Sequence, residues 1–266
     1  MTSQSAVELH RVGKGFPRSR RVAGARWWRR SHQELTALHP LDLRLEAGST
    51  LGVIGPNGSG KSTLVRILAT LILPDSGWAR VFGHDVVRDA LAVRRHVNRV
   101  SVEASFFKEL SPWENLVFGA RLYGEDGAGL RSRVEQVLDR LGLPRDSVDR
   151  PLRHLSRGQQ QKIAIARSLL TTPALLLMDE PTTGLDPRSK REVQVLVQEL
   201  RRDRAITTLL CTHDLEEAEI LCDRVVLMDQ GRVLADGTPE RLGSLQDLFF
   251  RVSGRALSEA DQEDIA

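Results

Sequence analysis

Residues 55–63 constrain this chain more than any other segment, because they fit the phosphate-binding pattern G-x-x-x-x-G-K-[ST]. An apolar run at 51–54 precedes them and apolar residues at helical spacing follow, so the loop stands between an expected buried strand and an expected helix. The glycines let successive backbone N–H groups point at phosphate oxygens, and the dipole of the following helix favours negative charge there. An ordinary glycine turn is the alternative. The complete motif in this setting predicts that the chain binds a nucleoside triphosphate.

Side-chain chemistry assigns roles within this loop. Lys61 would reach the β- and γ-phosphates, and the Ser62 hydroxyl would ligate Mg²⁺. The expected helix carries its apolar face on Leu64, Ile67, Leu68 and Leu71. The candidate nucleotide-binding residues of the loop are Gly55, Pro56, Asn57, Gly58, Ser59, Gly60, Lys61, Ser62 and Thr63.

The composition is that of a globular chain, with 41% hydrophobic and 27% charged residues among 266. The first residues lack a basic segment followed by an apolar one, so we expect no secretory signal. The most apolar stretch, 64–73, contains Arg66 and is about half as long as a membrane span, so a membrane role is expected to come through a partner. Cys211 and Cys222 have no metal-site or redox-motif neighbours, which favours reduced thiols in the cytosol.

Charge is unevenly distributed along the chain. The net charge of +3 is too small to imply nucleic-acid binding by itself, and we expect no nucleic-acid partner. Residues 11–30 nevertheless hold a group of basic residues and no acidic one, with Trp27 and Trp28 among them. Such a stretch could touch anionic lipid headgroups or could be a solvated loop whose tryptophans pack on their own domain. We favour the loop and keep lipid contact as the alternative.

The order of apolar patterns predicts an α/β fold. Alternating runs at 7–12 and 41–46 come before the continuous apolar strand of the phosphate loop, which indicates a small antiparallel sheet beside a buried parallel sheet. Further buried strands are expected at 174–178 and 206–210, with a helix after Asp186 between them. Residues 112–170 have a helical pattern and interrupt the sheet between its early and late strands.

Two carboxylates, Asp179 and Glu180, directly follow the expected strand at 174–178. Ligands of parallel sheets bind at the carboxyl ends of the strands. Asp179 could hold Mg²⁺ directly or through water, and Glu180 could polarise an attacking water. Solvated acids at a strand end are the alternative, and the phosphate loop on the same chain favours the catalytic interpretation. His213 follows the last expected strand. A single histidine there is more often structural than catalytic, and its position at the same sheet edge as Asp179 and Glu180 favours a role in the site.

A second glycine-containing segment, 155–159, precedes a helical pattern. Ser156 and Gln159 stand at the positions of a capping box, which is a sufficient structural explanation. A helix start with serine and glycine is also suited to an anion.

Together these features resemble the nucleotide-binding subunit of ATP-binding cassette (ABC) transporters. The resemblance covers 6–240 and rests on the loop at 55–63, the signature-like 155–159, the acidic strand end at 175–180, the loop at 183–186 and His213. It implies a RecA-like core at 6–104 and 171–240 that includes the antiparallel sheet, an inserted helical subdomain at 105–170, and a short extension at 241–266. It implies a head-to-tail dimer in which ATP on Lys61 of one copy is covered by the signature of the other.

Several residue roles come from this resemblance alone. Glu180 would be the base, and His213 would contact the γ-phosphate. Phe16 would stack on adenine. The signature residues Ser156, Gly158 and Gln159 would contact nucleotide across the dimer, and Asp186 of the 183–186 loop would also bind nucleotide.

Two positions depart from the family pattern. Glu103 stands where the family usually has the glutamine that senses Mg²⁺ and the attacking water. Its carboxylate could still reach the metal, but it adds negative charge beside Asp179 and Glu180. Arg157 replaces the second glycine of the signature, and we expect its side chain to point outward.

The resemblance also bears on cargo. The stretches 103–123 and 16–35 look like the exporter branch that moves drugs, lipids or polysaccharides through separate membrane permease subunits. We therefore expect a peripheral ATPase at the cytoplasmic face of the membrane, paired with a second identical or related cassette. Import of a small solute is the alternative. A chromosome-organising or ribosome-associated ATPase is less favoured, because the chain lacks a long heptad insertion and a second cassette.

Overall fold

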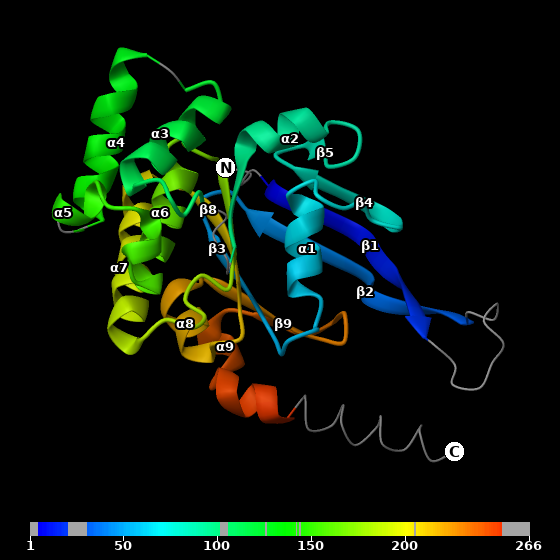
Figure 1. The fold of residues 1–266 in the computed structure, drawn as a ribbon. Helices are drawn as coiled ribbons and strands as arrows, with labels where there is room; N and C mark the ends of the chain where they lie inside the picture. The colour runs from blue at the N-terminus through cyan, green and yellow to red at the C-terminus, as the bar shows by residue number, and fades with distance from the viewer. Residues whose placement is uncertain are drawn as a thin grey trace.

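The computed structural model describes residues 5–20, 31–101, 106–125, 127–141, 143, 145–204 and 206–251. Two sheets lie side by side with helices on both sides of the larger one (Figure 1). The fold class expected from the sequence is confirmed.

The larger sheet has six strands in the order β10-β9-β3-β8-β7-β6. All its neighbouring pairs are parallel except β9 and β10. Its central strands are buried on both faces, with mostly apolar residues in β3 and β7 and with buried threonines beside the apolar residues of β8. The strands are β3 (Thr50–Ile54), β6 (Val97–Val100), β7 (Leu175–Asp179), β8 (Thr207–Thr212), β9 (Arg224–Asp229) and β10 (Arg232–Gly237). Because β3, β8 and β7 are adjacent and parallel, the segments that follow them meet at one edge.

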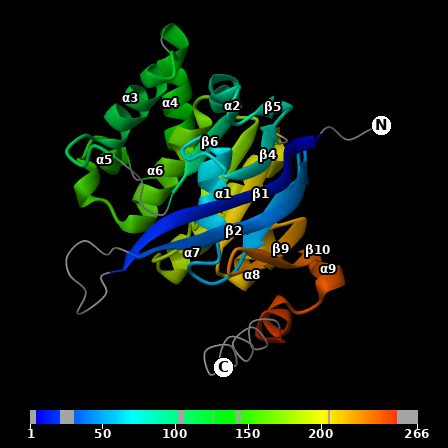
Figure 2. The same ribbon diagram turned by 90° about the vertical axis from the view of Figure 1, so that its right-hand side faces the viewer.

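The smaller sheet is antiparallel, with four strands in the order β2-β1-β4-β5. These are β1 (Ser5–Arg20), β2 (Ser31–Glu46), β4 (Ser76–Val81) and β5 (His84–Asp85). The prediction of a loop over the basic stretch 11–30 is wrong for 11–20, which belong to β1, and residues 17–20 pair with 31–34 at the start of β2. Figure 2 shows these two long strands running side by side. Trp27 and Trp28 lie outside the described residues, so their lipid or packing role stays a prediction.

The helical block lies between β6 and β7, as expected, and gathers on one side of the parallel sheet (Figure 1). It contains α3 (Pro112–Leu122), α4 (Ala128–Arg140), α5 (Arg145–Val148), a 3-10 turn (Leu152–His154) and α6 (Arg157–Leu169). The other helices include α1 (Lys61–Leu68), α2 (Ala90–His96), α7 (Pro187–Arg204), α8 (Leu215–Leu221) and α9 (Pro239–Leu242), and residues 245–251 are also helical. Across the part of the chain that the structure describes, a helix with the length and apolar character of a bilayer span is not found.

Helix α1 is shorter than its apolar pattern predicts. The helix ends at Leu68, and Thr70 adopts a left-handed backbone with φ of 59°. Leu71 is consequently exposed and does not belong to the apolar face of the helix.

The core has two parts, one on each face of the parallel sheet. Successive residues of a strand point to opposite faces, so Leu209 packs toward α1 and the antiparallel sheet whereas Leu210 packs toward the helical block. This double burial fixes the strands and therefore the positions of the loops at their ends.

Candidate nucleotide site

A hollow of about 270 Å³ lies at the edge of the sheet where β3 and β7 end. Its lining combines the phosphate loop, the acidic strand end and the Phe16 region of β1 and β2, which are far apart in sequence. The lining residues are Phe16, Leu35, Thr36, Ala37, Asn57, Gly58, Gly60, Lys61, Ser62, Thr63 and Glu180. The structure thus brings together residues that the sequence singled out for different reasons.

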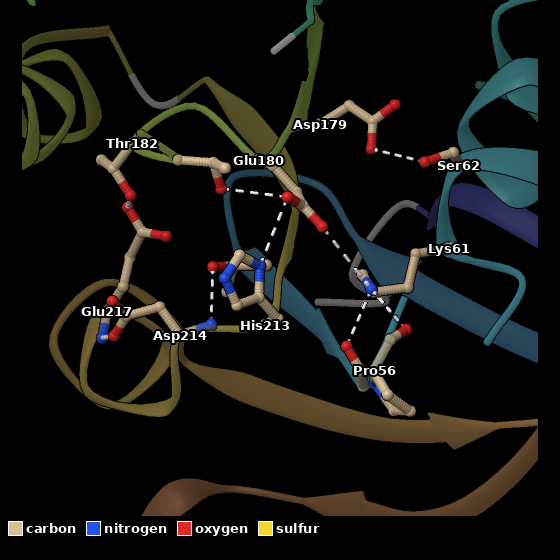
Figure 3. Close-up of polar contacts among 12 residues, drawn as sticks. Pro56, Lys61, Ser62, Asp179, Glu180, Thr182, His213, Asp214 and Glu217 are labelled. Carbon is tan, nitrogen blue, oxygen red and sulfur yellow. Dashed lines mark hydrogen bonds and ion pairs between the residues drawn. The ribbon is translucent and has the colours of Figure 1, made fainter. Parts of the chain in front are cut away.

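Lys61 is the first residue of α1 and is almost entirely buried. Its Nζ donates to the carbonyl oxygens of Gly55 at 2.8 Å and Pro56 at 3.0 Å (Figure 3). The same Nζ lies 3.7 Å from Glu180 Oε1. The ammonium group is therefore held inside the loop by neutral acceptors and one carboxylate, where an added anion would find a desolvated positive charge.

Two glycines of the loop are required by space as well as by backbone shape. A Cβ on Gly55 would lie 2.0 Å from the carbonyl oxygen of Met228, which is backbone and cannot move aside. Gly60 has φ of 104°, and a Cβ there would lie 2.6 Å from the carbonyl oxygen of Ala37. The loop can pack tightly against neighbouring backbone only with glycine at these positions.

Asp179 ends β7 and faces Ser62. The Ser62 hydroxyl donates to Asp179 Oδ1 at 3.0 Å, and Arg99 Nη2 lies 3.8 Å from Asp179 Oδ2. A hydroxyl and a carboxylate are hard oxygen donors of the kind that Mg²⁺ accepts, usually with phosphate oxygens and waters completing the shell. Within the described ranges, no group of three or more His, Cys, Asp or Glu side chains could hold a metal, so the protein supplies only part of a shell. Arg99 belongs to none of the motifs found in the sequence.

Glu180 lies in an unusual backbone conformation, with φ of 53°. Its amide donates to the carbonyl oxygen of Cys211 at 2.8 Å. Its Oε2 accepts from Thr183 Oγ1 at 2.9 Å and lies 3.3 Å from His213 Nδ1. Left-handed backbone is costly for a non-glycine residue, and these contacts hold Glu180 in it. His213 is about half exposed, so it can also face a ligand.

Two buried side chains, those of Cys211 and Glu217, lie next to this edge of the sheet. Burial raises the pKa of the Cys211 thiol well above its ordinary value, with the nearby Asp179 adding to the effect. Burial also raises the pKa of Glu217, whose Oε1 accepts from Thr182 Oγ1 at 2.8 Å (Figure 3). The Thr182–Glu217 contact fastens the loop after Glu180 to α8. Motifs could not reveal it, because it joins residues 35 positions apart.

The signature residues occupy a different place, at the start of α6. Ser156 Oγ accepts from the Gln159 amide at 3.2 Å, and Gln159 Oε1 accepts from the Ser156 amide at 2.9 Å, so the capping box is present. A Cβ on Gly158 would lie 2.4 Å from Ser189 Oγ in the first turn of α7. Among the described residues, Ser156, Gly158 and Gln159 do not belong to the lining of the hollow.

Asp186 and Arg157 also lie at this second place. Asp186 Oδ1 accepts from the amides of Arg188 at 3.1 Å and Ser189 at 3.0 Å at the start of α7. The side chain and amide of Ser189 are the main groups that lower the pKa of Asp186. Arg157 is exposed, as expected, and its Nη1 lies 3.0 Å from where a Cβ on Gly184 would stand.

Glu103 lies outside the described residues, so its predicted role as a metal ligand stays a prediction.

Comparisons with known proteins agree with this geometry. Residues 38–183 match the family described as ABC transporter. The chain is 47% identical over 208 residues to the daunorubicin/doxorubicin resistance ATP-binding protein DrrA of Streptomyces peucetius, covering 78% of this chain and 62% of that protein. It is 40% identical over 207 residues to the sulfate/thiosulfate import ATP-binding protein CysA 2 of Chromobacterium violaceum, covering 78% of this chain and 56% of that protein.

A solved structure shows the same fold. It is the dimeric post-hydrolysis state of the ATP-binding cassette MJ0796 bound to ADP and Pi, with a TM-score of 0.73 and 26% identity, covering 87% of this chain and 98% of the other. The fold and site define an ATP-binding cassette. This chain belongs to the ABC transporter family.

Proposed function

We propose that this chain is the ATP-hydrolysing subunit of an ABC transporter. One observation carries the proposal: Lys61 and Glu180 line one hollow, and Glu180 contacts both Lys61 and His213, with 3.7 Å between Lys61 Nζ and Glu180 Oε1 and 3.3 Å between Glu180 Oε2 and His213 Nδ1. A buried cation beside a fixed carboxylate is suited to holding a phosphate chain next to a general base.

In this mechanism the chain's residues mostly position groups and stabilise charge. Lys61 and the loop amides bind the β- and γ-phosphates. Glu180 orients the attacking water and accepts its proton at a carboxylate oxygen, while Thr183 holds the other oxygen. His213 contacts the γ-phosphate from the edge of β8. Phe16 stacks on the adenine at the rim of the hollow.

Mg²⁺ is proposed as the metal that accompanies ATP. Ser62 and Asp179 fit it, since both are hard oxygen donors already within 3.0 Å of each other. Glu103 is the third proposed ligand. When bound, the ion would neutralise charge on the phosphate oxygens.

A second cassette is the proposed partner at the nucleotide. Ser156, Gly158 and Gln159 would contact ATP held by the other copy, and Asp186 is proposed as a further nucleotide-binding residue. Two features support this arrangement: Ser156 is exposed at the start of α6, and the related solved cassette is a dimer with ADP and Pi. Closing such a dimer from 1% to 99% populated takes about 5.5 kcal/mol of differential binding, which a dry phosphate contact with charged donors can supply.

We propose that one cassette domain spans 6–240, with 6–104 and 171–240 as its core and 105–170 as its helical subdomain. Residues 241–266 would be a short extension. The placement of α3 to α6 between β6 and β7 supports the inserted subdomain.

A membrane permease is the proposed partner for transport, with the cassette on the cytoplasmic face. An exposed apolar group on and beside α3 supports this, because large exposed apolar side chains that gather together mark interaction sites. Phe107, Phe118, Leu122 and Tyr123 form the group and line a hollow of about 340 Å³ together with Arg99 and Arg167.

Export of a drug, lipid or polysaccharide is the proposed direction. The resistance protein named above supports a drug as cargo, at 47% identity. Import remains the second candidate, because the import protein is 40% identical over a similar length.

The test is to purify the tagged chain from membranes of its native host and identify co-purifying proteins. A polytopic membrane protein is expected. Deleting the gene should raise cellular accumulation of daunorubicin, and restoring wild type, but not Lys61→Ala, should lower it. Co-purification with a solute-binding protein, with unchanged drug accumulation, would favour import. Recovery only with DNA or ribosomes would refute transport.

A further inference from the structure

Asp75, in the turn before β4, contacts three consecutive residues of β1. Its Oδ1 accepts from Lys14 Nζ at 2.6 Å, and its Oδ2 accepts from the Gly15 amide at 2.7 Å. Its own amide donates to the Gly13 carbonyl oxygen at 2.9 Å. One exposed aspartate therefore holds the segment immediately before Phe16 through both backbone and side chain.

This segment is where the pairing of β1 is irregular. The register between β1 and β2 shifts around Lys14, and the pairing of β1 with β4 reaches no further than Gly13. Regular pairing with β2 resumes at Gly15, opposite Thr36, and continues at Phe16, opposite Leu35, whereas β4 no longer pairs with β1 there. Irregular pairing leaves backbone groups without their usual ladder partners, and here a carboxylate takes up the Gly15 amide.

Lys14 extends the contact to the aromatic ring. Its Nζ lies 5.5 Å from the centroid of the Phe16 ring, and its side chain is only 15% exposed. Phe16 and Leu35 line the nucleotide hollow, whereas Lys14 does not belong to that lining. The hydrogen bond from Lys14, followed by that from the Gly15 amide, lowers the pKa of Asp75 below its ordinary value.

We propose that Asp75 is a positioning residue for the nucleotide base. Through Lys14 and Gly15 it sets the Phe16 ring at the rim of the hollow, so that a base can stack on it while the phosphates lie on the loop. This inference rests on the proposed function, because Phe16 acts there as the stacking residue.

The experiment compares two ligands that share phosphates but not the base. The purified full chain is titrated with magnesium ADP and with magnesium pyrophosphate. Loss of base stacking predicts that Phe16→Ala weakens ADP binding about 5-fold or more. Asp75→Ala should weaken ADP binding by at least about 3-fold, and by no more than Phe16→Ala does. Neither variant should change pyrophosphate binding.

A matched control is Asp42→Ala. Asp42 is also exposed, accepts from the Arg11 amide at 3.0 Å and pairs with His10, so it holds β1 at an earlier point. Its removal should leave both affinities unchanged. In the double variant Asp75→Ala/Phe16→Ala, ADP should bind as in Phe16→Ala alone, because Asp75 acts through the ring.

The inference is overturned if Asp75→Ala leaves ADP affinity unchanged or lowers the affinities for ADP and pyrophosphate equally. It is also overturned if the double variant loses ADP affinity by the full sum of the two single losses. Should Asp75→Ala fail to fold, Lys14→Met replaces it, with a smaller loss expected because the Gly15 contact remains. Wild type that binds neither ligand would instead remove the proposed nucleotide function. Wild type that binds ADP with no change in Phe16→Ala would remove the stacking role of Phe16 and this inference with it.

Discussion

The carboxyl edge of the parallel sheet and the start of α6 both carry predicted nucleotide-contacting residues, but their polar groups are satisfied differently. At the sheet edge, Lys61, Asp179 and Glu180 are largely shielded from solvent, and their contacts join segments far apart in sequence: Glu180 contacts Lys61 and His213, and Asp179 contacts Ser62. At the start of α6, exposed Ser156 bonds only within its own turn in the contacts described. The groups of the sheet edge are therefore brought together by folding of the single chain, whereas the signature residues have only local contacts among those described, which is compatible with their proposed role of contacting nucleotide held by a second copy.

Of the substitutions considered, Glu180→Gln at the sheet edge should lower ATP turnover most. The amide keeps the side-chain shape but cannot accept a proton from water, so turnover should fall by about 10²–10⁴-fold. Binding groups remain, so ATP should hold the two copies together. Turnover by phosphate release and mass by light scattering at saturating magnesium ATP are the measurements. A monomeric variant under these conditions would contradict the shared-site proposal.

The role of the exposed start of α6 is tested by Ser156→Ala. This substitution should lower ATP turnover about 10-fold or more and leave ADP binding by the single chain unchanged. Loss of a cap alone costs about 1 kcal/mol of stability. Ser111→Ala is therefore the control, because Ser111 forms the same capping box at the start of α3. Equal turnover losses in both variants would mean that Ser156 only caps its helix.

A smaller effect separates the two neighbouring threonines of the loop after Glu180. Thr183→Val removes one hydrogen bond to the Glu180 carboxylate and should lower kcat about 5-fold, since such a bond contributes about 1 kcal/mol. Thr182→Val removes the contact with Glu217 and should lower the free energy of unfolding with little change in kcat. Steady-state kinetics and urea denaturation measure the two effects. If Thr182→Val lowered kcat and Thr183→Val lowered only stability, the roles given to these two residues would be wrong.

The smallest predicted effect concerns pH. Because burial raises the pKa of Glu217 in the folded chain, the folded state holds its proton to higher pH than the unfolded state does. Stability from this group is complete at low pH and is lost as pH rises from the unfolded value of about 4.3 through the raised pKa. Glu217→Gln should remove this decline, by on the order of 1 kcal/mol between pH 5 and 8. The free energy of unfolding of both proteins is measured by urea denaturation across this pH range. If it changed with pH equally in wild type and in Glu217→Gln, the prediction would be contradicted.

Sequence reasoning succeeded where a motif directly follows a buried strand. The phosphate loop, Asp179, Glu180 and His213 all come right after continuous apolar runs, so their common edge was predictable. Arg99, Thr183 and the Glu217 contact were missed, because they depend on which strands and loops become neighbours. The long ends of β1 and β2 were missed for another reason: their arginine-rich, polar residues lack the apolar alternation that indicates a strand.

Both cysteines are buried, which has a practical consequence for measuring the proposed approach of two cassettes. Cys211 is fully buried with a raised pKa, and Cys222 is also buried, so neither native thiol presents a ready target for a maleimide label. A cysteine introduced at an exposed position near the start of α6 would take up a spin label or fluorophore alone. Distances between two such labels would then report the approach of the cassettes in otherwise unaltered protein.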